Sequence, residues 1–442
     1  MNKVTHRAMS ALIVAAILFA GLGVYLVRFA VHGGEWATFA ANNNFYTSGM
    51  LAAGTLTDRY GTILANADGD VHEYAADSNV RRAVYHAVGD YSGHVGTGAI
   101  IAFSSKLVGY NPVTGTYGAD AGGKQIALSL DSGLCATAQQ ALMGRKGMVL
   151  VSNYQTGEIL VMTSSPTLDP AVENAEPPDG SYINRCLNAK FTPGSIFKLV
   201  TAAAAIENIP DLEERTFTCN GSLNVAGVVI NCSGYHGTQT FEDAMANSCN
   251  CAFAEIALEL GGKTLESYVR DYGFTSAQKL DSISTMAGSF TRDADGAPGL
   301  AWSGIGQYED LVCPYSMLRY VSAIACGGTL REPTLLLDHK NGKTDLLDAD
   351  TANKLRDLMS YNVQAHYGTW NFPGLNICAK TGTAEVGDGT SHAWFTGFLQ
   401  DEEHPYAFIV FVENGGGGLS VATPIANTVL QTAVRRGTDM EY

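Results

Sequence analysis

The chain has 442 residues, of which 27 are basic and 43 are acidic, so its formal net charge is −16. This acidic balance, without a basic patch, argues against a nucleic-acid-binding protein. The length leaves room for more than one domain.

The first predicted element is a membrane-spanning helix over residues 8–28. Residues 8–27 carry no charge, and as a helix they extend about 30 Å, enough to cross a bilayer. Lys3 and Arg7 precede this stretch and only Arg28 follows closely, which favours an N-terminus inside the cytoplasm and the rest of the chain outside it. A cleaved signal peptide is the alternative, but its apolar region would be shorter.

Two further regions follow along the chain. Residues 33–124 are glycine-rich and lack a repeated pattern, and we interpret them as a short juxtamembrane pedestal. Residues 125–442 are predicted to form the catalytic domain. Its expected helices cover 134–145 and 422–435 and its expected strands 377–384, 393–399 and 406–413, which together indicate an antiparallel sheet flanked by helices.

Ser195 and Lys198 form the first candidate catalytic pair, in the segment Phe191-Thr-Pro-Gly-Ser-Ile-Phe-Lys198. Pro193-Gly194 indicates a turn that leads into a buried helix, so Ser195 would open that helix and Lys198 would lie one turn further on. A serine hydroxyl needs a base to become a nucleophile. Lysine serves as that base only when neutral, which requires burial and a second cation, and Lys380 is the candidate for that cation. The alternative is an ordinary helix cap beside a surface lysine.

Ser248-Cys249-Asn250 is the second motif. It precedes an apolar helical stretch over residues 252–260, so we expect its hydroxyl and amide on a loop between helices, facing the same cleft. Both residue types also serve as ordinary helix caps.

Lys380-Thr-Gly-Thr383 is the third motif and lies on the strand expected over 377–384. Gly382 removes a side chain from this strand, which predicts room for a peptide along its edge. Lys380, Thr381 and Thr383 offer donors for a substrate carboxylate.

Ser-x-x-Lys, Ser-x-Asn and Lys-Thr-Gly in this order are the signature set of penicillin-binding proteins and class A β-lactamases. Further stretches of the chain resemble class B penicillin-binding proteins, namely residues 54–65, 147–151, 156–160 and 304–307. The resemblance implies an α/β (α+β) fold of the serine β-lactamase and transpeptidase type. It also implies a peptidoglycan D,D-transpeptidase that crosslinks stem peptides, reacts with β-lactams, needs no cofactor and partners a SEDS-family glycosyltransferase.

The same resemblance assigns roles to the motif residues. Ser195 would attack the D-Ala-D-Ala carbonyl with Lys198 as base, and Ser248 would relay a proton to the leaving group. Asn250 would hold the acyl amide. The third motif would bind the carboxylate, and the backbone N–H groups of Ser195 and Thr383 would form the oxyanion hole.

Two other functions stay open at this point. A class A β-lactamase needs a glutamate with an asparagine four residues later to hydrolyse its acyl-enzyme, and no glutamate from Glu255 to Glu332 has that asparagine. A β-lactam sensor or a non-catalytic cell-wall scaffold would carry the same motifs without turnover.

The nine cysteines are an odd number, so at least one is unpaired within the chain. Cys219 and Cys232 flank a predicted hairpin that permits a disulfide between them. A zinc site that adds His236, Cys249 or Cys251 is the less favoured alternative, because the sequence has no Cys-x-x-C pair. The sequence therefore predicts no metal.

Overall fold

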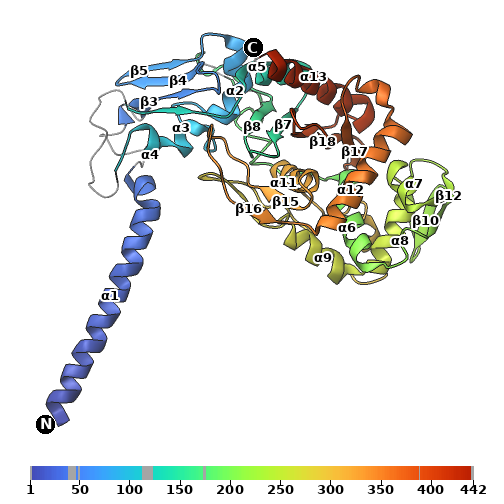
Figure 1. The fold of residues 1–442 in the computed structure, drawn as a ribbon, viewed down its shortest axis with the longest axis horizontal. Coiled ribbons are helices and arrows are strands. Elements are labelled where there is room, and N and C mark those ends of the chain that lie inside the picture. The colour runs from blue at the N-terminus through green and yellow to red at the C-terminus, as the bar shows by residue number, and fades with distance from the viewer. Residues whose placement is uncertain are drawn as a thin grey trace.

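The computed structural model describes residues 2–37, 46–47, 50–111, 123–172, 176–387 and 389–439. Helix α1 (Asn2–Ala37) projects away from the folded body, with the N-terminus at its far end (Figure 1). The most apolar 18-residue stretch within Lys3–Gly33 of this helix has a mean hydropathy of 2.4, and none of that stretch is buried by the rest of the chain. The predicted span over 8–28 lies within this helix, which is long and apolar enough to cross a bilayer.

A four-stranded sheet follows α1, with the strand order β5-β4-β3-β6. Its strands are β3 (Ala53–Thr57), β4 (Ile63–Asp68), β5 (Val71–Tyr74) and β6 (Gln125–Ala127), and the short β1 (Tyr46–Thr47) and β2 (Met50–Leu51) precede them. Strand β6 runs parallel to β3, so this sheet crosses the boundary expected at residue 124. The domain boundaries stay a prediction, and residues 112–122 of the expected pedestal lie outside the described residues.

The larger sheet has five strands in the order β17-β18-β19-β7-β8, and all neighbours are antiparallel. The strands are β7 (Gly147–Asn153), β8 (Ile159–Ser165), β17 (Ile377–Glu385), β18 (Ser391–Leu399) and β19 (Tyr406–Val412). Most of their side chains are buried because helices cover both faces. The antiparallel sheet flanked by helices that the sequence predicts is confirmed.

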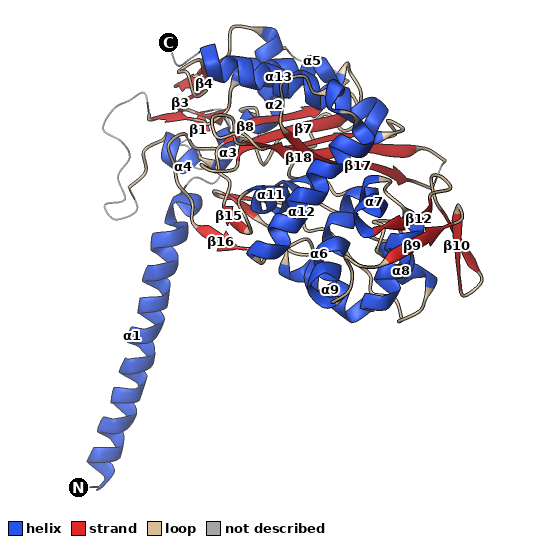
Figure 2. Cartoon of the chain, turned by 45° about the vertical axis from the view of Figure 1, so that its right-hand side comes forward, coloured by secondary structure: helices blue, strands red, loops and turns tan. Residues whose placement is uncertain are grey.

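Helices lie on both sides of this sheet (Figure 2). One face carries α2 (Ser78–Val88), α5 (Ser132–Leu142) and α13 (Thr423–Asp439), with α3 (Ala99–Ala102) and α4 (Ser104–Leu107) near the smaller sheet. The other face carries α11 (Pro314–Ala325) and α12 (Ala349–Asn362). The remaining helices of that side are α6 (Lys198–Asn208), α7 (Phe241–Ala246), α8 (Asn250–Leu260), α9 (Gly262–Asp271) and α10 (Pro298–Ser303).

Four small hairpins complete the described fold. β9 (Thr216–Cys219) pairs with β12 (Gly237–Thr240), and β10 (Ser222–Val225) pairs with β11 (Val228–Asn231). These two lie beside α7 and α8 at the end of the molecule away from α1 (Figure 1). The others are β13 (Lys279–Leu280) with β14 (Ile283–Ser284), and β15 (Thr329–Arg331) with β16 (Lys343–Asp345).

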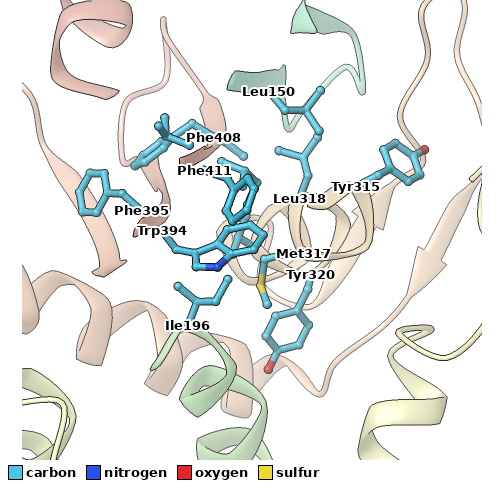
Figure 3. Packing of buried hydrophobic residues seen from close by; sticks show 14 of the residues in the cluster. Leu150, Ile196, Tyr315, Met317, Leu318, Tyr320, Trp394, Phe395, Phe408 and Phe411 are labelled. Carbon is cyan, nitrogen blue, oxygen red and sulfur yellow. The ribbon is translucent and has the colours of Figure 1, made fainter. Parts of the chain in front are cut away.

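The core between the large sheet and α11 supports the segment that carries Ser195. Trp394 on β18 is fully buried, and its ring centroid lies 4.3 Å from that of Phe411 on β19. Ile196, next to the candidate nucleophile, lies beneath the Trp394 ring (Figure 3). The Trp394 indole also donates a 3.0 Å hydrogen bond to the Thr192 carbonyl. Apolar packing and one buried hydrogen bond thus fix this segment against the sheet.

Candidate active site

Ser195 lies in a 3₁₀ turn, η1 (Gly194–Phe197), and the α-helix α6 begins only at Lys198. The expectation that Ser195 opens the α-helix is therefore wrong by one turn. Gly194 has φ +56°, and a Cβ at this position would lie 2.7 Å from the Thr383 carbonyl oxygen. The turn approaches β17 so closely that only glycine fits there.

Lys198 is fully buried and connects the first motif to the second. Its Nζ donates to the Ser248 carbonyl at 2.6 Å and to Asn250 Oδ1 at 2.7 Å, and it lies 3.3 Å from Ser248 Oγ. Ser248 has φ +52°, a left-handed conformation that turns the chain between α7 and α8. Among the described residues, the Ser195 hydroxyl has no hydrogen-bond partner, so it is free to meet a substrate.

Lys380 on β17 is also fully buried, and it approaches the Ser248 hydroxyl. Its Nζ lies 2.9 Å from Ser248 Oγ and 3.1 Å from the Thr381 carbonyl. Burial lowers the pKa of Lys198 to about 8, against the smaller opposing effect of the nearby Cys249, Cys232 and Cys251. Burial, with the charge of Lys198, holds the pKa of Lys380 well below its usual range. Desolvation is thus the main cause of the lowered pKa of both lysines. The repulsion between the two ammonium groups further lowers the pKa of Lys380.

Successive residues of β17 alternate between the cleft and the protein interior. Thr381 and Thr383 line the cleft with Ser195, whereas Gly382 is buried on the opposite side. A Cβ at Gly382 would lie 3.0 Å from Ile196 Cγ2 and 3.1 Å from Trp394 Cβ. The missing side chain at Gly382 therefore allows the turn that carries Ser195 to pack closely against β17. The sequence had instead predicted that it would leave room for a peptide along the strand edge.

The sequence did not indicate two residues that position β17. The buried Tyr367 hydroxyl accepts hydrogen bonds from the Thr381 backbone N–H at 3.1 Å and from Thr381 Oγ1 at 3.2 Å. The Gln307 amide pairs with the backbone of Glu385, accepting from its N–H at 3.1 Å and donating to its carbonyl at 3.3 Å. Gln307 lies in a stretch that carried the family resemblance, but Tyr367 had no sequence signal because its role depends on a tertiary contact.

The cleft brings the cleft-facing residues of all three motifs together. Residues from six stretches of the chain line it, namely Ser195, Asn231, Cys232, Ser233, Asn247, Ser248, Asn250, Trp302, Ile305, Gln307, His366, Thr381, Thr383 and Glu385. The half-buried Ser248, which lines this cleft, contacts the buried amines of Lys198 and Lys380. A cleft that holds the Ser195 hydroxyl and, through Ser248, two buried amines, one of them with a pKa lowered to about 8, is equipped for nucleophilic acyl transfer.

A cluster of sulfur atoms lies beside this cleft. None of the nine cysteines is joined in a disulfide in the structure, and the possible disulfide between Cys219 and Cys232 stays a prediction. Cys219 ends β9 and Cys232 follows β11, which belong to different hairpins, so the two cysteines are not cross-strand neighbours. Cys219, Cys232, Cys249 and His236 instead place one ligand atom each within 4.8 Å of all the others.

Comparison with known proteins agrees with this geometry. The sequence profile of the family described as "Penicillin binding protein transpeptidase domain" matches residues 147–431, which include all three motifs. The chain belongs to the penicillin-binding protein transpeptidase family. The class B resemblance is confirmed by relatives within this family.

The peptidoglycan D,D-transpeptidase PbpA of Mycobacterium tuberculosis is 28% identical over 334 residues, which cover 66% of this chain and 67% of the relative. Stage V sporulation protein D of Bacillus subtilis is 31% identical over 319 residues, which cover 65% of this chain and 49% of that protein. The crystal structure of the D,D-transpeptidase domain of a peptidoglycan glycosyltransferase from Eggerthella lenta superposes with a TM-score of 0.75 at 26% identity. That superposition covers 87% of this chain and 98% of the other.

Proposed function

We propose that this penicillin-binding protein is a peptidoglycan D,D-transpeptidase that crosslinks stem peptides through an acyl-enzyme on Ser195. The observation that carries the proposal is the network in which the buried Lys198 and Lys380 both contact Ser248, which lines the same cleft as Ser195. Few structural roles require two lysines to be desolvated together, because burial penalises each charge.

Acylation begins when neutral Lys198 accepts the Ser195 hydroxyl proton. Ser195 Oγ then bonds to the carbonyl carbon between the two D-alanines, and the C–N bond of the terminal D-alanine breaks. The leaving amine takes a proton through Ser248 Oγ, which lies within 3.3 Å of Lys198 Nζ and 2.9 Å of Lys380 Nζ. Ser248 is the hydroxyl that contacts both amines, which makes it the bridge for this proton.

The second half of the reaction reverses these steps with a different amine. The acceptor amine of a neighbouring stem peptide attacks the acyl carbon and gives up a proton to Lys198 by way of Ser248. The ester bond to Ser195 Oγ then breaks, and Lys198 returns a proton to that oxygen. Asn250 is already oriented by Lys198 Nζ, and its amide Nδ2 donates to the Asn231 carbonyl at 2.9 Å, so it borders the cleft where the acyl amide would lie.

Substrate binding uses the cleft-facing residues of β17. Thr381 and Thr383 present their hydroxyls to the substrate carboxylate, and Lys380 Nζ, which donates to the Thr381 carbonyl at 3.1 Å, is a further donor close by. The backbone N–H groups of Ser195 and Thr383 stabilise the oxyanion, which is a contribution of roughly 3–4 kcal/mol per donor in related chemistry.

Covalent labelling by a fluorescent penicillin tests the nucleophile. A β-lactam presents the same carbonyl and carboxylate, so we expect one adduct, located at Ser195 by peptide mapping and absent in Ser195→Ala. Ser276→Ala, an exposed serine outside the cleft, is the matched control and should label like the unmodified protein. An adduct at another residue, or no adduct on folded protein, would refute the assignment.

Turnover separates the three candidate functions. A transpeptidase releases D-alanine from a synthetic D-Ala-D-Ala peptide and keeps its penicillin adduct for a long time, because the chain lacks the deacylating glutamate of class A β-lactamases. Rapid release of hydrolysed penicillin would favour a β-lactamase. Labelling without any D-alanine release, even with an acceptor amine present, would favour a sensor or scaffold.

We also propose a single-pass membrane topology with the catalytic domain outside the cytoplasm. The support is the apolar helix Lys3–Gly33 and the basic residues that precede its most apolar part. A cysteine-reactive reagent that does not cross membranes tests this, with a cysteine placed at Ser276 in intact cells. Labelling only after the membrane is opened would refute the outward orientation.

The proposed membrane partner is a SEDS-family glycosyltransferase that polymerises the glycan strands. The span and the segment 54–65 would be the contact surface. Exchanging residues 8–27 for an unrelated span, with the pedestal retained, should weaken co-purification with the partner if the span is a contact. Unchanged co-purification with every candidate polymerase would exclude the span and leave the pedestal.

A further inference from the structure

The sulfur cluster beside the cleft draws its members from four separate points of the chain. Cys219 ends β9, Cys232 follows β11, His236 precedes β12, and Cys249 caps α8. Cys219 and Cys249 are buried, and the other two are half-buried. Their ligand atoms converge within 4.8 Å of one another.

The spacing of these atoms fits one tetrahedral metal ion. With Zn–S bonds of about 2.3 Å and Zn–N bonds of about 2.0–2.1 Å, tetrahedral ligands lie roughly 3.8 Å apart for two sulfurs and roughly 3.6 Å apart for sulfur and nitrogen. Cys232 Sγ lies 3.9 Å from Cys249 Sγ and 3.6 Å from His236 Nδ1. Three thiolates and one imidazole are a donor set that selects zinc over hard cations such as magnesium or calcium.

Backbone groups around the cluster suit charged sulfur. The Asn250 N–H donates to Cys232 Sγ at 3.2 Å, and the Ala252 N–H donates to Cys249 Sγ at 3.5 Å. Both donors belong to the first turn of α8, where unpaired N–H groups and the helix dipole favour negative charge. Hydrogen bonds of this kind support metal-bound thiolates in the second coordination sphere.

The hairpins that carry three of the four ligands have little core of their own. β10 and β11 form a two-stranded hairpin with most positions exposed or half-buried, including Val228 and Val229. Isolated two-stranded hairpins are at best marginally stable in water. A metal ion that joined both hairpins to α8 would supply the stability that apolar burial does not.

We propose that Cys219, Cys232, Cys249 and His236 bind one zinc ion, and that this ion holds the Ser248–Asn250 loop in its catalytic geometry. Each cysteine gives up its thiol proton to solvent on binding, and His236 binds as neutral imidazole. The ion would fix Cys249, which lies between Ser248 and Asn250 in sequence. It would also fix Cys232, which lines the cleft and accepts a hydrogen bond from the Asn250 N–H.

The competing chemistry is disulfide formation. Cys219 Sγ lies 3.5 Å from Cys251 Sγ, and Cys232 Sγ lies 3.9 Å from Cys249 Sγ, so an oxidant could join either pair. A Cys232–Cys249 disulfide would remove two of the four ligands and a Cys219–Cys251 disulfide would remove one, so neither oxidised form keeps the four-ligand site.

The test uses the full chain purified in detergent without chelators. In one half of the preparation, free thiols are alkylated at lysis, so that any disulfides within the cluster can be detected in that half. Elemental analysis of the unalkylated half should give about one zinc per chain, and X-ray absorption should show three sulfurs and one nitrogen around it. Cys249→Ser and His236→Ala should lose the zinc, whereas Cys326→Ser, a half-buried cysteine outside the cluster, should keep it. Circular dichroism of each variant reports whether its fold is intact.

Three results would overturn the metal site. The first is a chain that labels with penicillin but binds no zinc after dialysis against zinc chloride. The second is that the ligand variants keep their zinc. The third is that the alkylated half contains disulfides within the cluster. Because zinc content is measured without any substrate, failure of this proposal is distinguishable from failure of the proposed transpeptidase activity.

A second measurement tests the positioning role, which rests on the proposed function. Removing the zinc with a chelator should slow penicillin acylation by at least about 10-fold, the size typical of disturbing a metal site's supporting contacts, and zinc chloride should restore it. An acylation rate that does not change when the zinc is removed would refute the positioning role.

Discussion

The pH dependence of acylation tests the role of Lys198 most directly. Lys198 is fully buried, and its pKa is lowered from 10.5 to about 8, mainly because burial penalises the ammonium form. A shift of this size corresponds to roughly 3 kcal/mol of preference for the neutral amine. The neutral form is the base, so acylation should rise as pH rises through the pKa.

The magnitude follows from the fraction of neutral amine. With a pKa of about 8, roughly 9% of Lys198 is neutral at pH 7 and roughly 90% at pH 9, which predicts about a 10-fold increase in the acylation rate constant. A lysine with an ordinary pKa would be about 300-fold less neutral at pH 7. The structure thus predicts a midpoint near 8.

The assay is stopped-flow acylation by a fluorescent penicillin from pH 6 to pH 10, with circular dichroism to confirm that the fold persists. Lys354→Arg, on the surface, is the control and should keep the same profile. A flat profile, a rate that falls from pH 6 to pH 8, or a midpoint near 10 would each contradict the burial argument for Lys198.

Three further predictions concern side chains around the nucleophile. Lys198→Arg should abolish acylation because guanidinium stays charged, whereas Lys380→Arg should retain more because it keeps positive charge beneath β17; equal residual rates in the two variants would contradict these roles. Gly382→Ala should lower the free energy of unfolding by about 1–3 kcal/mol, because the added Cβ overpacks the nucleophile's turn, and a urea titration that shows no change would argue against that contact. Tyr367→Phe should weaken acylation by about 1–3 kcal/mol, since the Thr381 N–H loses its buried acceptor, and recovery of the full rate would show that Thr381 is held by other contacts.

Local sequence patterns predicted most of the elements that carry the site. The strands expected over 377–384, 393–399 and 406–413 correspond to β17, β18 and β19, with ends that differ by at most two residues. The helix after Ser248 was expected over 252–260 and begins at Asn250. Such elements follow from apolar periodicity and turn residues, which act over a few neighbours.

The conformation around Ser195 depended on more than local pattern. The sequence indicated a helix beginning at the serine, whereas contact of Gly194 with β17 imposes a 3₁₀ turn before α6 starts. The requirement for glycine at position 382 also comes from tertiary packing, because only the folded structure shows that a side chain there would meet Ile196 and Trp394. Tertiary contacts override the local helix propensity where two segments approach within van der Waals contact.

The sequence by itself determined the chemistry of this protein, because the three motifs carry the reacting groups and their order identifies the family. Only the tertiary structure decided how those groups are tuned and what lies beside them. Burial of Lys198 and Lys380 depends on segments far apart in the chain, and desolvation is what lowers the pKa of each amine. The cysteine cluster shows the same dependence. The sequence offered these residues only as the less favoured zinc alternative, because it has no Cys-x-x-C pair, and their side chains come together only where two hairpins and a helix cap meet.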